Sequence, residues 1–274
     1  MPLAAVNGVE LYYETAGDGD PLVLVHGSWG DHYNWVPVMK DLSRDHRVLV
    51  YDRRGHSRSE RPPGQGSRRE DEDDLAALME TLGFAPAFVA GNSFGASTAL
   101  GLAGRRPELF RGILAHEPPL MGVVADDAAA RPLMAATALR MASVVERLRE
   151  GEVLSGARQF VEEVAFGPGE WELMPDRVRE TFRVNAPTFA DEQGDPRWAD
   201  LDLGRLSGYR GPALLTKGSE SPRWFAAIVG RLAGALPQAL THTFEGAGHI
   251  PHVSHPSAYT RQVGALVALG RRAA

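Results

Sequence analysis

The sequence contains no cysteine and only two lysines, Lys40 and Lys217. Without cysteine, disulfide frameworks, thiolate metal sites and a cysteine nucleophile are excluded, so covalent catalysis must use oxygen or nitrogen. Neither lysine follows a Gly and precedes a Ser or Thr, as the phosphate-binding loop of many nucleoside triphosphatases requires. That class of nucleotide site is therefore excluded.

Basic residues are not in excess either, with 29 Lys plus Arg against 35 Asp plus Glu. We therefore expect neither nucleic acid nor a membrane as a partner, because both present anionic surfaces. The N-terminal segment has no basic cluster and reaches Glu10 and Glu14 early, which favours a cytoplasmic protein over a secreted one. The uncharged stretch 81–104 is long enough to cross a bilayer, but Pro86 and a Gly-rich turn interrupt it.

Short apolar runs alternate with segments of helical periodicity along both ends of the chain. Four runs are typical of strands buried on both faces: 22–26, 47–52, 87–92 and 112–116. Between them, segments such as 74–82 and 96–104 have the spacing or composition of helices. The pattern resumes late in the chain with the predicted strands 213–217 and 241–244. This alternation predicts a mostly parallel α/β sheet, and Asn7-Gly8 predicts a hairpin before it.

The alternation stops between 118 and 211, where segments such as 133–149 and 152–166 have helical patterns. We interpret 118–211 as a helical insertion that covers the strand ends. The core domain would then consist of 1–117 and 212–274.

One pentapeptide carries the signature of a nucleophile. Gly91-Asn92-Ser93-Phe94-Gly95 matches G-x-S-x-G and lies between a predicted strand and a predicted helix. A sharp turn there strains the backbone of Ser93 and exposes its hydroxyl above the sheet. The motif alone is short, and an idle Ser in a Gly-rich turn is the competing interpretation.

Two further segments supply what a Ser nucleophile needs. The loop 26–30, His-Gly-Ser-Trp-Gly, can turn backbone N–H groups toward a developing oxyanion, alongside the N–H of Phe94. Late in the chain, Gly246-Ala247-Gly248-His249 places His249 at the end of a Gly-rich loop, suited to act as general base.

Together these motifs resemble the α/β-hydrolase superfamily over nearly the whole chain. The segments 26–30, 52–56, 91–97 and 246–252 occur in the order of that family. The resemblance implies an eight-stranded, mostly parallel sheet with helices on both faces, and a helical cap (lid) at 118–211 inserted after the sixth strand. It also implies an oxyanion hole formed by the backbone N–H groups of Ser28 and Phe94, and Trp29 at the substrate pocket.

The acid of the expected triad departs from the commonest family pattern. After the strand 213–217 that pattern is Gly-x-x-Asp-Pro, but here Ser221 stands at the Asp position. A hydroxyl cannot balance an imidazolium charge, so a carboxylate must come from elsewhere. Glu117 follows strand 112–116, which resembles the acid position of haloalkane dehalogenases, and Glu220 neighbours the usual site. We favour Glu117 and keep Glu220 as the alternative; Glu117 could also be a hinge carboxylate before two prolines.

Other charged clusters do not indicate a metal or a cofactor. His249, His252 and His255 form H-x-x-H-x-x-H, but prolines within and after it oppose an aligning helix, so His252 and His255 are interpreted as rim or capping residues. The acidic run 70–74 lacks the pattern of a calcium loop and fits a helix start. We expect neither a metal nor a cofactor.

A Ser nucleophile attacks carbonyl carbon, which predicts hydrolysis of an ester, lactone or thioester of a small-molecule substrate. The large apolar residues of 118–211 predict an apolar or aromatic pocket. One alternative is a C–C bond hydrolase acting on an activated diketone, since the elbow is similar in that subgroup, although Ala96 replaces its second Gly. Another is a non-catalytic ligand-binding protein on this scaffold.

Overall fold

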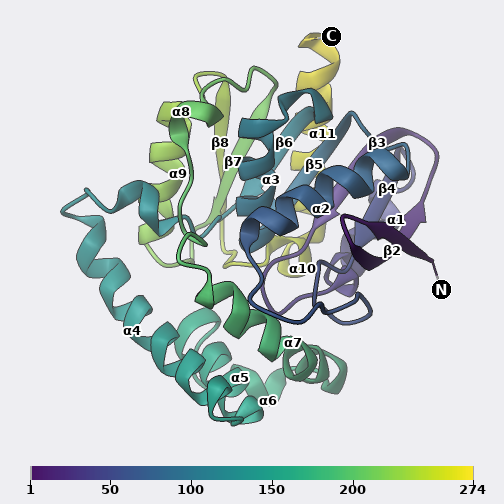
Figure 1. Ribbon diagram of the computed structural model, residues 1–274. Coiled ribbons are helices and arrows are strands. Elements are labelled where there is room, and N and C mark those ends of the chain that lie inside the picture. Colours follow the sequence, from purple (N-terminus) through teal and green to yellow (C-terminus); the bar gives the residue numbers. More distant parts are fainter. Residues whose placement is uncertain (1, 274) are drawn as a thin grey trace.

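The computed structural model describes residues 2–273 and contains one eight-stranded sheet (Figure 1). The strands are β1 (Leu3–Val6), β2 (Val9–Ala16), β3 (Asp20–Val25), β4 (His46–Tyr51), β5 (Ala87–Asn92), β6 (Phe110–His116), β7 (Ala213–Gly218) and β8 (Ala239–Phe244). Their order is β1-β2-β4-β3-β5-β6-β7-β8, with β2 antiparallel to its neighbours and the remaining pairs parallel. The predicted fold class is confirmed.

The hairpin at the N-terminal edge forms where Asn7-Gly8 predicts it. Val6 pairs with Val9, and both turn residues have positive φ angles, 45° at Asn7 and 74° at Gly8. Asn and Gly tolerate this left-handed conformation better than other residues, which is why the pair favours a two-residue turn.

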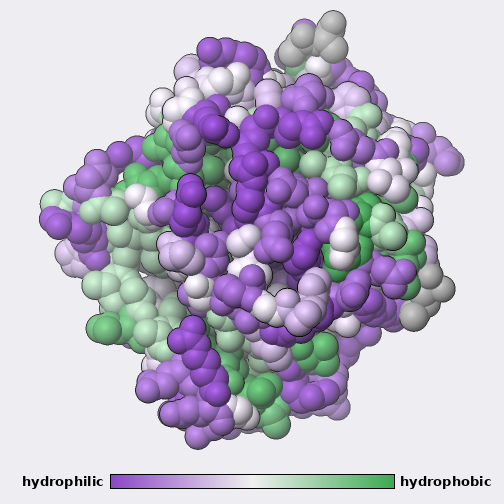
Figure 2. Space-filling view, in the orientation of Figure 1, coloured by the Kyte–Doolittle hydropathy of each residue, from purple (hydrophilic) through white to green (hydrophobic). Residues whose placement is uncertain are grey.

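Alternate side chains of the strands pack against helices on opposite faces of the sheet. In β3, Val23 and Val25 face a core cluster that includes residues of α2 (Arg68–Thr81), α3 (Phe94–Arg105) and α9 (Trp224–Ala235). Leu22 and Leu24 face the other cluster, which includes residues of α1 (Val36–Leu42) and α11 (Pro256–Ala273). This period of two explains the continuous apolar runs of the central strands β3 to β7, because both faces of these strands are mostly buried. Hydrophilic residues cover most of the outer surface over α2 and α3 (Figure 2).

The chain between β6 and β7 forms helices beyond one end of the sheet, at the bottom of Figure 1. They are α4 (Ala130–Arg149), α5 (Val153–Gln159), a π-helical turn (Phe160–Ala165), α6 (Glu170–Leu173) and α7 (Asp176–Gly194). The last helix before β7, α8 (Leu203–Leu206), lies apart from them against α3 and α9, at the upper left of Figure 1. Several of their apolar side chains pack with Trp29 in a third core cluster. The division of the chain into a core and a cap stays a prediction. Within residues 2–273, no helix is long and apolar enough to cross a bilayer.

Candidate active site

Ser93 lies in a strained turn between β5 and α3. Its φ of 55° and ψ of −124° are outside the regions that L-residues favour. The flanking glycines are required by close backbone approach: a Cβ on Gly91 would lie 2.6 Å from Ala96 N, and one on Gly95 would lie 2.3 Å from Val25 O. The G-x-S-x-G pattern therefore has a steric reason in this fold.

The close approach at Gly95 gives a prediction about stability. Gly95→Ala should lower the free energy of unfolding by more than about 2 kcal/mol, since backbone atoms of β3 cannot yield to the new methyl group. Gly264→Ala is the matched control, because a Cβ there meets nothing within 4 Å. It should be neutral or stabilising by up to about 1 kcal/mol. Urea unfolding of both variants measures the difference, and equal midpoints would show that the elbow is not tightly packed.

Ser93 and His249 line the same cavity, which has a volume of about 410 Å³. Ser28, Trp29 and Phe94 line it as well. The structure thus brings all the residues predicted for nucleophile, base, oxyanion hole and pocket to one space.

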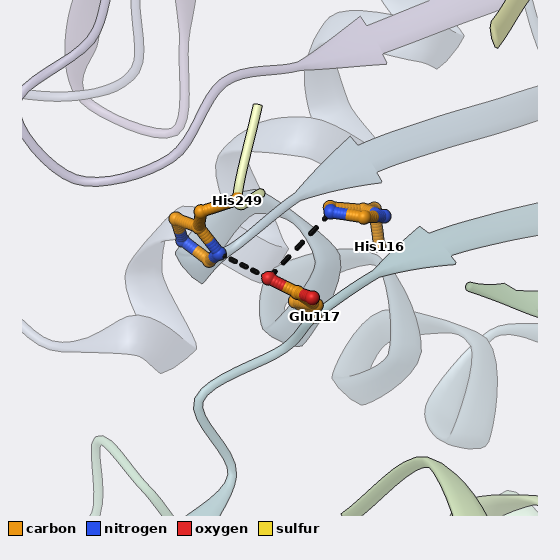
Figure 3. Close-up of side chains that lie close together, drawn as sticks. All are labelled: His116, Glu117 and His249. Atoms are coloured by element: carbon orange, nitrogen blue, oxygen red, sulfur yellow. Dashed lines mark hydrogen bonds and ion pairs between the residues drawn. The ribbon is translucent and has the colours of Figure 1, made fainter. Parts of the chain in front are cut away.

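Glu117 is the carboxylate that meets His249 (Figure 3). His249 Nδ1 lies 2.6 Å from Glu117 Oε2, and Glu117 Oε1 accepts a 2.7 Å hydrogen bond from the Gly218 N–H. Burial acts to raise the pKa of Glu117, but the hydrogen bond and charge of His249 outweigh it and lower that pKa to about 2. Glu117 is therefore ionised at neutral pH although its side chain is fully buried.

Glu220, the alternative acid, is exposed, and its side chain accepts a hydrogen bond from Ser219. Ser221, at the position of the commonest family acid, has a buried hydroxyl without a hydrogen-bond partner among residues 2–273. The structure brings Glu117 to His249 and leaves Glu220 on the surface.

Two residues that the sequence did not single out also hold His249. Asn92 Nδ2 donates a 2.8 Å hydrogen bond to the His249 carbonyl, and the Phe225 ring stacks on the imidazole with a centroid distance of 5.1 Å. These contacts join distant parts of the chain, so no local sequence pattern indicates them.

The loop 26–30 is oriented by a neutral histidine. The Arg53 N–H donates to His26 Nε2 at 2.9 Å, so the proton resides on Nδ1, which lies 2.8 Å from Gly27 O. Burial, together with the charge of Arg53, lowers the pKa of His26 to about 3. Because a trans peptide points its C=O and N–H in opposite directions, this bond turns the Ser28 N–H away from His26. Among residues 2–273, neither the Ser28 N–H nor the Phe94 N–H donates to another protein group.

The acidic run 70–74 does more than begin a helix. Ser67 and Glu70 form a capping box, which agrees with the predicted helix start. Asp71, Glu72 and Asp74 are buried, however, and form ion pairs with the arginines Arg53, Arg105 and Arg54, respectively. The helix-dipole interpretation is therefore incomplete. The acidic run also supplies buried ion-pair partners, and the arginines that pair with it are distant in the sequence.

The three histidines of H-x-x-H-x-x-H do not converge. His252 is buried against Trp35 with a centroid distance of 4.4 Å, and His255 lies nearer the surface beside Ser254. The rim position predicted for His252 is wrong, since its ring packs into the core. One group with suitable spacing for a metal ion is His116, Glu117 and His249, whose ligand atoms lie within 4.8 Å of one another. A metal there would compete with the Glu117–His249 hydrogen bond.

The chain belongs to the alpha/beta hydrolase fold family, whose sequence model matches residues 20–256. Several proteins that it resembles are named hydrolases or lactonases, which favours an enzyme over the ligand-binding alternative.

Similarity to individual proteins supports this assignment. The chain is 27% identical over 276 residues to zearalenone hydrolase of Bionectria ochroleuca, covering 95% of each. The crystal structure of the enol-lactonase from Burkholderia xenovorans LB400 matches 97% of this chain and all of that one, with a TM-score of 0.81 and 25% identity. A match to 2-hydroxymuconate semialdehyde hydrolase of Pseudomonas sp. strain CF600 is 36% identical over 111 residues, 38% of each chain. With several curated relatives the similarity spans less than half of their length.

Proposed function

We propose that this protein is a serine hydrolase that cleaves a carboxylic ester, lactone or thioester through an acyl-enzyme. The observation that carries the proposal is the hydrogen bond between the buried carboxylate of Glu117 and His249, in a cavity that Ser93 also lines. An ionised carboxylate fixes the imidazole with its proton on Nδ1, which leaves Nε2 free to accept a proton.

In the acylation step, the Ser93 hydroxyl loses its proton to His249 Nε2 as its oxygen bonds to the substrate carbonyl carbon. The carbonyl oxygen becomes an oxyanion, which the N–H groups of Ser28 and Phe94 stabilise. The bond to the leaving group then breaks, and His249 returns the proton to the departing oxygen or sulfur. Water repeats the cycle on the acyl-enzyme, releasing the acid and restoring Ser93.

The cavity favours a neutral, largely apolar acyl or aromatic substrate. Its apolar lining residues include Trp29, Met121, Met141, Phe160, Phe166, Met174, Phe182, Phe189, Trp198, Trp224 and Phe225. Many of these come from the segment 118–211, which we propose is the cap that shapes the pocket. Similarity to an enol-lactonase supports lactones within this class.

A panel of p-nitrophenyl esters of increasing acyl length, with aliphatic and aromatic lactones beside it, tests the substrate class. We expect kcat/KM to rise from acetyl to medium-length or aromatic acyl groups, because each buried methylene contributes about 0.8 kcal/mol. A preference for anionic acyl groups would contradict the apolar-pocket proposal.

C–C bond hydrolysis of an activated diketone is the second candidate. The similarity to 2-hydroxymuconate semialdehyde hydrolase favours it. A vinylogous diketone substrate assayed beside the lactones separates the two: the first proposal expects lactone turnover to exceed diketone turnover.

His249 as general base predicts a pH dependence. The rate of ester hydrolysis should fall on acidification, since protonated His249 cannot accept the Ser93 proton. Glu117, with its pKa of about 2, stays ionised through this range and does not cause the fall. A chelator should leave the rate unchanged; loss of activity with chelator and recovery with zinc would instead favour a metal at His116, Glu117 and His249.

A further inference from the structure

Asn185 of α7 is a fully buried polar residue that contacts the loop 26–30 from the helical segment. Its Nδ2 donates hydrogen bonds to Gly30 O at 2.8 Å and to Trp29 O at 3.2 Å. Its Oδ1 accepts a 2.7 Å bond from the Ser57 N–H. Because a backbone N–H can only donate, this last bond fixes the amide orientation and directs Nδ2 to the two carbonyls.

Trp29 is held by the same segment through its side chain. The indole is 1% exposed and packs among aromatic rings, with centroid distances of 4.5 Å to Phe189 and 5.3 Å to Phe182. Its backbone has a φ of 65°, a conformation that bulky L-residues rarely adopt. The strain at Trp29 persists because contacts on both its side chain and its carbonyl oppose relaxation.

We propose that the helical segment completes the oxyanion hole: Asn185 is a positioning residue that holds the loop 27–30 so that the Ser28 N–H faces the substrate oxygen. This inference rests on the proposed serine mechanism. Rotation about φ of Trp29 moves the Ser28–Trp29 peptide, and with it the Cα of Ser28, to which the Ser28 N–H group is attached. Relaxation at Trp29 therefore displaces the adjacent donor, and Asn185 opposes that relaxation by fixing the Trp29 carbonyl.

Burial makes this arrangement specific. The carbonyls of Trp29 and Gly30 have no access to an equivalent donor if the amide is removed, so the loop must move to recover a partner. A displacement of about 1 Å in an active site can reduce the rate by about 100-fold. The effect should appear in the transition state, where the oxyanion carries charge, and much less in the binding of an uncharged ligand.

The test compares Asn185→Ala with wild type in p-nitrophenyl butyrate hydrolysis and in inhibition by phenylboronic acid, which forms a tetrahedral adduct with a Ser nucleophile. We expect kcat/KM to fall about 10- to 100-fold and the boronic acid inhibition constant to rise by a similar factor. The inhibition constant of benzyl alcohol, a neutral ligand that forms no adduct, should change less than about threefold. The contacts that bind an uncharged ligand are not lost in this variant.

Thr188→Val is the matched control. Thr188 lies one turn further along α7, is similarly buried, and hydrogen-bonds Gly55 O, away from the oxyanion loop. It should leave both the rate and the boronic acid affinity within about threefold of wild type, as expected when no transition-state contact is lost. If Asn185→Ala does not fold, Asn185→Asp is the second variant. It keeps the side-chain shape and the oxygen that accepts the Ser57 N–H, and it removes the amide donor.

Two results would overturn the positioning role. One is an unchanged rate in Asn185→Ala or Asn185→Asp. The other is an equal loss of affinity for boronic acid and benzyl alcohol, which a loosened helical segment alone would produce. Failure of the serine mechanism is distinguished from failure of the positioning role by the Ser93→Ala variant. If the serine mechanism is wrong, Ser93→Ala retains activity; if only the positioning role is wrong, Ser93→Ala is inactive and the Asn185 variants keep the wild-type rate.

Discussion

Ser93→Ala should lower kcat for p-nitrophenyl ester hydrolysis by several orders of magnitude, on the order of 10⁶ if the triad is as efficient as that of a good protease. The variant retains the cavity and the Glu117–His249 pair but has no oxygen to form an acyl-enzyme. Substrate binding should survive, so the loss belongs to kcat. Stopped-flow and steady-state assays on the same esters measure it.

Ser97→Ala is the control for this change. Ser97 is fully buried in α3 one turn after the elbow, and its hydroxyl has no hydrogen-bond partner in the part of the chain that the structure describes. Its removal should leave kcat within about twofold, because no reacting atom is lost. A Ser93→Ala variant with wild-type kcat would reject the serine mechanism.

Glu117→Gln should lower kcat by up to about 10⁴, the loss that an Asp-to-Asn change causes in a serine protease. The amide still fits beside Gly218 and His249 but cannot balance the imidazolium charge. Glu220→Gln is the matched control and should be mild, since Glu220 is exposed and pairs with Ser219.

The contrast between these two variants decides the identity of the acid. A crippled Glu220→Gln enzyme would mean that the loop after β7 rearranges and that Glu117 serves only as a hinge. If neither variant loses more than about tenfold, equivalent to about 1.4 kcal/mol, another group orients His249 and the assignment of Glu117 is wrong.

Much of the fold could be predicted because local patterns and tertiary structure agree. The central strands β3 to β7 are mostly buried on both faces, so their apolar runs are unambiguous, and Asn7-Gly8 has few alternatives to a tight turn. Ser93 stands in a motif whose glycines mark close backbone approach, and His249 follows Gly246, whose φ of 71° favours glycine.

The helix α7 could not be recognised by the same means. Asn185, Thr188 and Glu192 are buried polar residues on this helix, and Pro187 lies inside it. Polar residues at buried positions interrupt the apolar periodicity by which an amphipathic helix is recognised. Their partners, the loop carbonyls and Arg53, lie more than 100 residues away in the sequence.

The choice between Glu117 and Glu220 also depended on the sheet. The Glu117 N–H bonds Thr216 O, and its carboxylate bonds the Gly218 N–H, because β6 and β7 are parallel neighbours. That register brings the end of β6 beside the loop that carries the acid in the commonest family pattern. Sequence spacing alone cannot give this register, which is why both candidates stayed open.

The formation of a covalent bond at Ser93 is the central claim, and mass spectrometry of protein treated with a fluorophosphonate tests it most directly. A serine activated by His249 and Glu117 should take up one phosphonyl group, located by peptide mapping to the segment that contains Ser93. Labelling should be slow or absent in His249→Ala. An unlabelled wild-type protein that still hydrolyses esters, or an adduct on a different residue, would contradict the account.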